Sequence, residues 1–124
     1  MKYKRLGQDL LEYPGVIQEV IRGSRSEIEH YLKHNSLMVN EQDYYGRTPI
    51  MHAALQCNLD MIKWLSKTKD IDVKIVDYEG NDLLFYAFWS GNDELVDFVF
   101  GLLHKPPRGA PAMVGTSIEG FGNG

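Results

Sequence analysis

The feature that most constrains this chain is a sequence pattern that occurs twice with an offset of 34 residues. Asp43, Tyr44 and Gly46 recur as Asp77, Tyr78 and Gly80. The same offset also pairs three downstream positions: Ala53 with Ala87, Asn58 with Asn92, and Ile62 with Val96. A period of this size is the signature of stacked structural units, each too small to bury its apolar face alone. The chain is therefore predicted to form a repeat protein.

The residues that follow Gly46 predict what each unit contains. Gly46 allows the positive φ of a tight turn. Thr48 is suited to cap a helix that begins at Pro49, because proline has no N–H to leave unpaired at the first helical position. Ala53 and its neighbours then give an apolar helix face that a second helix can approach closely. Each unit is predicted to be a turn followed by two antiparallel helices.

The stretch Thr48–Ala54 resembles the T-P-L-H-x-A core of ankyrin repeats. One residue departs from it, since Met51 stands at the histidine position and His52 comes one place later. In that family the histidine ties neighbouring loops together, so the shift predicts a looser loop. The resemblance implies an all-α ankyrin-repeat solenoid of helix-turn-helix units with short β-hairpin-like loops.

Three units are expected in a domain of residues 1–104: a degenerate repeat at about 9–40, a repeat at 43–76 and a repeat at 77–104. In the first unit, Val16, Ile17, Val20 and Ile21 have helical spacing, and Ser26 is expected to cap the second helix.

The last predicted helix, residues 93–103, is apolar on most sides, although a terminal repeat needs a polar outer face. Self-association through this helix is one way to cover it. The Pro/Gly-rich tail, residues 105–124, is either disordered or folds back over the helix. Four apolar tail residues are candidates for that contact: Met113, Val114, Ile118 and Phe121.

Composition narrows the class of protein. A net charge of −4 disfavours nucleic-acid binding, and no apolar run is long enough to span a membrane. A signal peptide is not expected, because no apolar segment follows the basic residues at the N-terminus. The single cysteine, Cys57, excludes an internal disulfide and favours a reducing, cytoplasmic location.

Candidate catalytic and metal-binding residues are few. His30 and His34 have the i, i+4 spacing of a shared metal site, with Glu27 as a third candidate ligand. A zinc site needs three or four ligands, so two exposed surface histidines are the favoured interpretation. Cys57 and His52 show no partner that would activate a nucleophile. The chain is expected to be non-catalytic, without a cofactor or metal.

The remaining hypothesis is a surface that binds a partner protein or peptide. In ankyrin repeats the loop tips and first helices line a concave groove, and the resemblance carries that role to matching positions here. Eleven candidate contact residues follow, with Ile21 beside them: Arg22, Tyr44, Tyr45, Arg47, Leu55, Gln56, Tyr78, Glu79, Asn81, Trp89 and Ser90. Tyrosine, tryptophan and arginine are enriched at binding hot spots.

Two alternatives remain open for this surface. Leu55 and Trp89 are equally consistent with filling gaps between units. A small acidic chain also fits an inhibitor or immunity-type protein that blocks one target enzyme.

Overall fold

The computed structural model describes residues 13–104, which form three antiparallel helix pairs and contain no β-strand in that range. The first pair is α2 (Gly15–Arg22) and α3 (Arg25–His34), followed by the short 3-10 helix η2 (Ser36–Asn40). The second pair is α4 (Pro49–Leu55) and α5 (Leu59–Leu65), and the third is α6 (Leu83–Ser90) and α7 (Asp93–Leu103). The predicted all-α architecture is confirmed.

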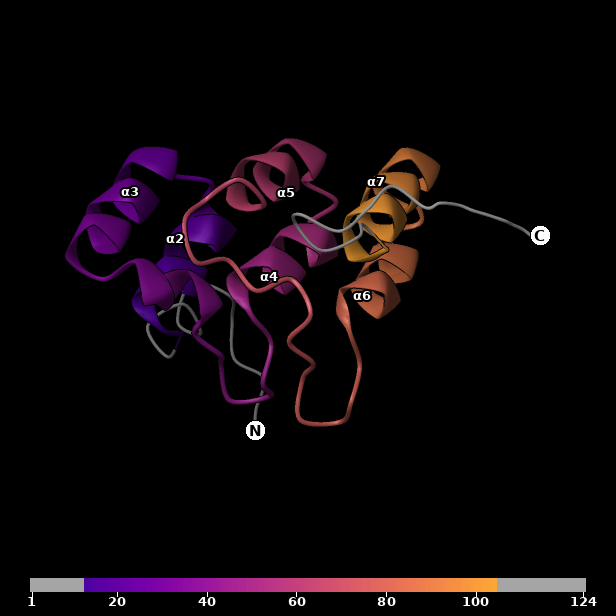
Figure 1. The fold of residues 1–124 in the computed structure, drawn as a ribbon, viewed down its shortest axis with the longest axis horizontal. Coiled ribbons are helices and arrows are strands. Elements are labelled where there is room, and N and C mark those ends of the chain that lie inside the picture. Colours follow the sequence, from indigo (N-terminus) through magenta and orange to yellow (C-terminus); the bar gives the residue numbers. More distant parts are fainter. Residues whose placement is uncertain (1–12, 105–124) are drawn as a thin grey trace, which may run out of the picture.

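The three pairs stack side by side in two layers (Figure 1). Helices α2, α4 and α6 form one layer, α3, α5 and α7 form the other, and the loops that precede α4 and α6 extend beyond the layers on one side. Helix α4 contacts both α2 and α6. Ala53 and Ala54 on α4 are fully buried, and their small side chains allow the neighbouring helices to approach closely. One continuous core runs through the stack.

The period of 34 residues also determines where the second helices begin. Asn58 caps α5 by accepting a hydrogen bond from Met61 N at 3.1 Å, and Asn92 caps α7 from Leu95 N at 3.0 Å. One period earlier lies Ser24, which accepts from Glu27 N and caps α3. The prediction that Ser26 caps this helix is wrong, because the helix begins at Arg25.

Helix α2 is capped by a distant residue. Pro14 precedes it and offers no side-chain hydrogen bond, so the carboxylate of Glu41 takes that role. Its Oε2 accepts from Val16 N at 2.6 Å and Ile17 N at 3.0 Å. Burial raises the pKa of Glu41, although these two hydrogen bonds act in the opposite direction. The loop before α4 is thereby fastened to the first helix pair.

The turn within each pair places one residue in the left-handed region. Gly23 and Gly91 occupy this position in the outer pairs, with φ of 78° and 68°. In the middle pair the residue is Cys57, with φ of 56°. A side chain is strained in this conformation, which glycine adopts freely. Cys57 therefore stands at a site suited to glycine.

The third pair leaves apolar side chains exposed on the described part of the chain. Phe88 on α6 is 63% exposed and Phe100 on α7 is 52% exposed. The tail predicted either to cover this region or to be disordered lies outside the described residues, as do residues 1–12. Every described helix falls short of the length and apolar character needed to cross a membrane.

Candidate functional site

The loops before α4 and α6 have the same internal hydrogen bonds, one period apart. Asp43 Oδ1 accepts from the backbone N–H groups of Tyr45 and Arg47 at 2.8 and 2.9 Å. Asp77 Oδ1 accepts from Glu79 N and Asn81 N at 2.9 and 2.8 Å. Gly46 and Gly80 turn each loop at φ of 87° and 86°. Each aspartate therefore shapes a tip whose side chains point outward.

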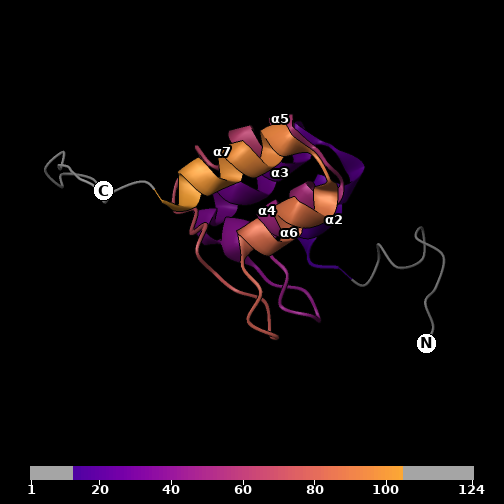
Figure 2. The same cartoon turned by 90° about the vertical axis from the view of Figure 1, so that its right-hand side faces the viewer.

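The two tips lie side by side and are bonded to each other (Figure 2). Tyr78 N donates to Tyr45 O at 3.1 Å. The side-chain amide of Gln42 donates to Gly46 O at 2.9 Å and to Val76 O at 3.2 Å, so it spans both loops. The prediction of a looser loop is wrong, because these contacts tie the loops together.

His52 on α4 and Tyr86 on α6 each hold one of the two loop aspartates by a side-chain contact. His52 Nε2 lies 2.7 Å from Asp43 Oδ2, and both residues are buried. One period later the hydroxyl of Tyr86 donates to Asp77 Oδ2. Burial tends to raise the pKa of both aspartates, but the hydrogen bonds outweigh it and lower both values. A phenol thus does in the third pair what an imidazole does in the second.

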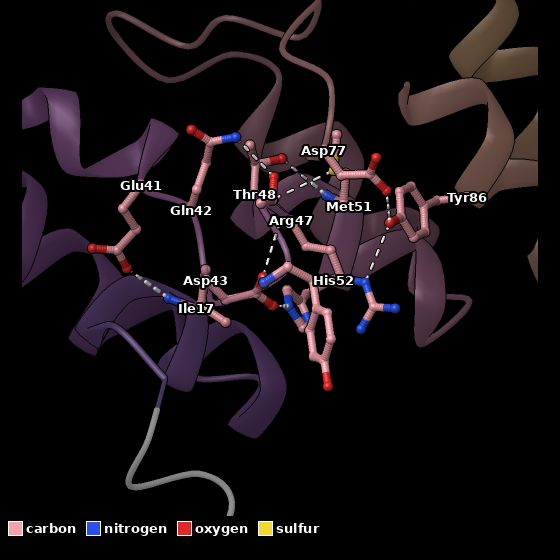
Figure 3. A network of polar contacts seen from close by, with 12 residues as sticks. Ile17, Glu41, Gln42, Asp43, Arg47, Thr48, Met51, His52, Asp77 and Tyr86 are labelled. Carbon is pink, nitrogen blue, oxygen red and sulfur yellow. Dashed lines mark hydrogen bonds and ion pairs between the residues drawn. The ribbon is translucent and has the colours of Figure 1, made fainter. Parts of the chain in front are cut away.

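Arg47 is oriented by the neighbouring unit (Figure 3). Its Nε donates to the Tyr86 hydroxyl at 3.2 Å, so Asp77, Tyr86 and Arg47 form one hydrogen-bonded chain. The guanidinium carbon lies 4.9 Å from the centre of the Tyr45 ring. Burial tends to lower the pKa of Arg47, but the Tyr86 hydroxyl and the charge of Asp43 raise it. The guanidinium is charged, and its terminal nitrogens have no hydrogen-bond partner among the described residues.

These side chains surround a groove of about 540 Å³ between the two loop tips and helices α4 and α6, here called the inner groove. Tyr44 is 87% exposed and Trp89 is 68% exposed, so neither is sealed in the fold. The inner groove brings together eight of the eleven predicted contact residues: Tyr44, Tyr45, Arg47, Leu55, Tyr78, Glu79, Asn81 and Trp89.

The other three predicted residues do not line the inner groove and have partners within the chain. Gln56 Nε2 donates to Ile21 O at 3.1 Å and so links the first two helix pairs. Ser90 Oγ donates to Ala87 O at 2.6 Å, and Arg22 pairs with Glu19 at 3.3 Å.

Three residues that line the inner groove were not predicted: Asp77, Phe85 and Tyr86. Phe85 stands one period after Met51, which is buried, so the repeat offset by itself gives no sign that Phe85 is exposed. Its spacing of four residues from Trp89 places both rings on one helix face, with centroids 6.4 Å apart. That spacing is the signal that identifies Phe85 as a groove residue.

The alternative catalytic and metal-binding candidates lie elsewhere. The rings of His30 and His34 are 5.0 Å apart, and Nδ1 of His34 is 3.0 Å from the His30 carbonyl oxygen. Within residues 13–104 no group of three or more His, Cys, Asp or Glu residues is arranged to hold a metal ion. Cys57 is exposed, with Asn92 Nδ2 at 3.6 Å from its sulfur.

Comparison with known proteins gives a consistent result. The family described as ankyrin repeats (3 copies) matches residues 17–106. The search of curated proteins finds no match. A similar solved structure is a chain from the complex of the predatory endopeptidase Bd0816 of Bdellovibrio bacteriovorus with the immunity protein Bd3460. The two structures align with a TM-score of 0.60 and 23% sequence identity. The alignment covers 71% of the present chain and 45% of the chain in the complex. With the family profile covering all three helix pairs, this chain belongs to the ankyrin-repeat family.

Proposed function

We propose that this protein is a non-catalytic module that binds a partner protein or peptide in the inner groove. The observation that carries the proposal is the grouping of exposed aromatic side chains around one oriented arginine. Tyr44, Tyr78 and Trp89 expose most of their surface without packing into the core. Large aromatic side chains dominate binding energy where a partner covers them.

The chemistry of the groove defines the kind of contact it offers. Leu55, Phe85 and Trp89 form an apolar side that suits an apolar side chain of the partner. Tyr86 holds Nε of Arg47, and the terminal guanidinium N–H groups, which have no partner among the described residues, are available to a carboxylate or a backbone carbonyl. Glu79 is exposed at the opposite tip and favours a basic group there. The partner segment is expected to combine these features.

The test is capture of the partner by the wild-type protein and by the double variant Tyr45→Ala, Trp89→Ala. Immobilised protein is exposed to a lysate of the organism that makes it, and retained proteins are identified by mass spectrometry. Each hot-spot aromatic is worth about 2 kcal/mol or more, so the double variant should lose affinity by about a thousandfold. Far-UV circular dichroism should not change, because Trp89 is exposed and Tyr45 is about half exposed.

A matched control lies on the same helix. Phe88 is 63% exposed, next to Trp89, and does not line the inner groove. Phe88→Ala should retain the partner that the double variant loses. Capture that survives in the double variant, or that is lost equally in Phe88→Ala, would contradict the role of the inner groove.

A second candidate function is specific inhibition of one enzyme, as an inhibitor or immunity-type protein. The similarity to a chain from a complex that contains an endopeptidase and an immunity protein favours it. The net charge of −4 suits a basic target surface. If the captured partner is an enzyme, stoichiometric addition of this protein should abolish its activity, and higher salt should slow their association. An enzyme that stays fully active when saturated would refute this function.

The location and the absence of catalysis belong to the same proposal. A cytoplasmic location is supported by the single thiol, Cys57, which is free and exposed. A non-catalytic role is supported by the two buried aspartates, Asp43 and Asp77, because their carboxylates accept the hydrogen bonds that shape the loops.

A further inference from the structure

A second groove lies on the other helix layer, between α3 and α5, and is here called the outer groove. Its volume is about 610 Å³. Leu32 on α3 and Trp64 on α5 are half-buried against the core and give it an apolar floor. Its remaining lining residues are polar or charged: Glu29, Lys33, Ser36, Lys67, Thr68 and Lys69. The inner groove is lined by α4, α6 and the loop tips, so the two grooves share no residue.

Positive charge is concentrated at the outer groove. Residues 13–104 contain eight lysines and arginines and are acidic overall, yet four of the eight lie here. Lys33, Lys67 and Lys69 line it, and Arg25 lies over the Trp64 ring at 5.7 Å. None of the three lysines forms an ion pair with a described residue, in contrast to Arg22, which pairs with Glu19. Among the described residues that line this groove Glu29 is the one carboxylate, and next to it Asp70 Oδ2 accepts a hydrogen bond from the hydroxyl of Ser36.

We propose that the outer groove is a second docking surface, for a partner segment that carries acidic residues beside one large apolar side chain. The apolar side chain would cover Trp64 and Leu32. The carboxylates would lie against Lys33, Lys67 and Lys69, none of which is ion-paired within residues 13–104. Charges at the edge of an apolar patch mainly set partner choice and association rate, while the apolar contact supplies affinity. The protein would then connect two partners, one on each helix layer.

The experiment uses peptides selected from a random phage-displayed library of about 12 residues. Selection is made on the full chain carrying Tyr45→Ala and Trp89→Ala, so that the inner groove does not contribute. Selected peptides should combine two or more Asp or Glu residues with Trp, Phe or Leu. Lys67→Glu with Lys69→Glu should weaken a synthetic peptide of this kind by about tenfold or more, and added salt should weaken it as well.

The control is Lys74→Glu, an exposed lysine away from the outer groove that undergoes the same Lys-to-Glu replacement at a single position. It should leave peptide affinity unchanged. If charge reversal disturbs the fold, seen by circular dichroism, Lys67→Gln with Lys69→Gln replaces it.

Three results would overturn the proposal: selected peptides that lack acidic residues, peptides insensitive to both lysine variants, or no selected peptide at all. Retention of a single-stranded oligonucleotide or of anionic vesicles by the same lysines, without peptide binding, would assign the surface to another class of ligand. Because the assay protein lacks Tyr45 and Trp89, on which the test of the inner groove depends, failure here leaves the proposed function unaffected.

Discussion

Gly46 and Gly80 turn equivalent loops, but their surroundings differ, and this difference leads to a quantitative prediction. Alanine at Gly80 would meet no described atom within 4 Å. Its cost is the left-handed backbone, about 1–2 kcal/mol, reduced by about 0.4–1 kcal/mol because alanine restricts the unfolded chain. Gly80→Ala should therefore lower the free energy of unfolding by about 1 kcal/mol.

Alanine at Gly46 meets the next loop directly. Its Cβ would lie 2.5 Å from Tyr78 N and 2.7 Å from Tyr78 Cδ1, so the backbone of Tyr78 must move. That movement removes the hydrogen bond from Tyr78 N to Tyr45 O, worth about 0.5–1.5 kcal/mol, and strains the contact between the loops. Together with the backbone cost, Gly46→Ala should lower the free energy of unfolding by about 3 kcal/mol.

The assay is urea unfolding of both variants, followed by circular dichroism at one temperature. The expected outcome is a difference of about 2 kcal/mol between them, with an unchanged slope against urea. Equal losses would show that the two loops do not support each other through the Tyr45–Tyr78 contact. Loss of partner capture in Gly46→Ala at temperatures where it is folded would further place Tyr78 in the binding surface.

Three further predictions concern stability and association. Cys57→Gly should raise the free energy of unfolding by about 0.5–1 kcal/mol, because it relieves the left-handed φ, and a lower urea midpoint would contradict this. The pKa values of Asp43 and Asp77 are lowered on folding, so the stability they give is present above about pH 4 and is lost as pH falls through the folded values. Asp77→Asn should therefore be less stable than wild type at pH 7 and show a smaller loss between pH 4 and pH 2, measured by urea titration. If the exposed end of the stack drives self-association, Phe100→Glu should convert dimers to monomers in light scattering, and a wild type that is monomeric at high concentration would refute that role.

The repeat offset explains why so much of the fold was predictable. It specifies the turns at Gly46 and Gly80 and the caps at Asn58 and Asn92, and these local signals agree with the packing of the stack. The same offset, extended one step back, identifies Ser24 rather than Ser26 as the cap of α3. Glu27 and Glu29 follow Ser26, and acidic residues are typical of a first helical turn, so the local signal favours Ser26 where the period favours Ser24.

The inner groove was less predictable because it depends on how units differ. Tyr86 replaces the histidine seen at His52, and only the folded arrangement shows that its hydroxyl reaches both Asp77 and Arg47. The capping of α2 by Glu41, from 25 residues away, likewise has no local signal. Contacts between units are therefore the part of the molecule that the sequence alone does not predict.

The attachment of Arg47 to Tyr86 has a consequence for engineering. The arginine belongs to one unit and the phenol that aims it belongs to the next, so recognition here is a property of the junction. Grafting the middle unit alone into a designed array would transplant the charge without its alignment. To keep Arg47 in the same orientation, the graft must also include Tyr86 and Asp77 from the next unit.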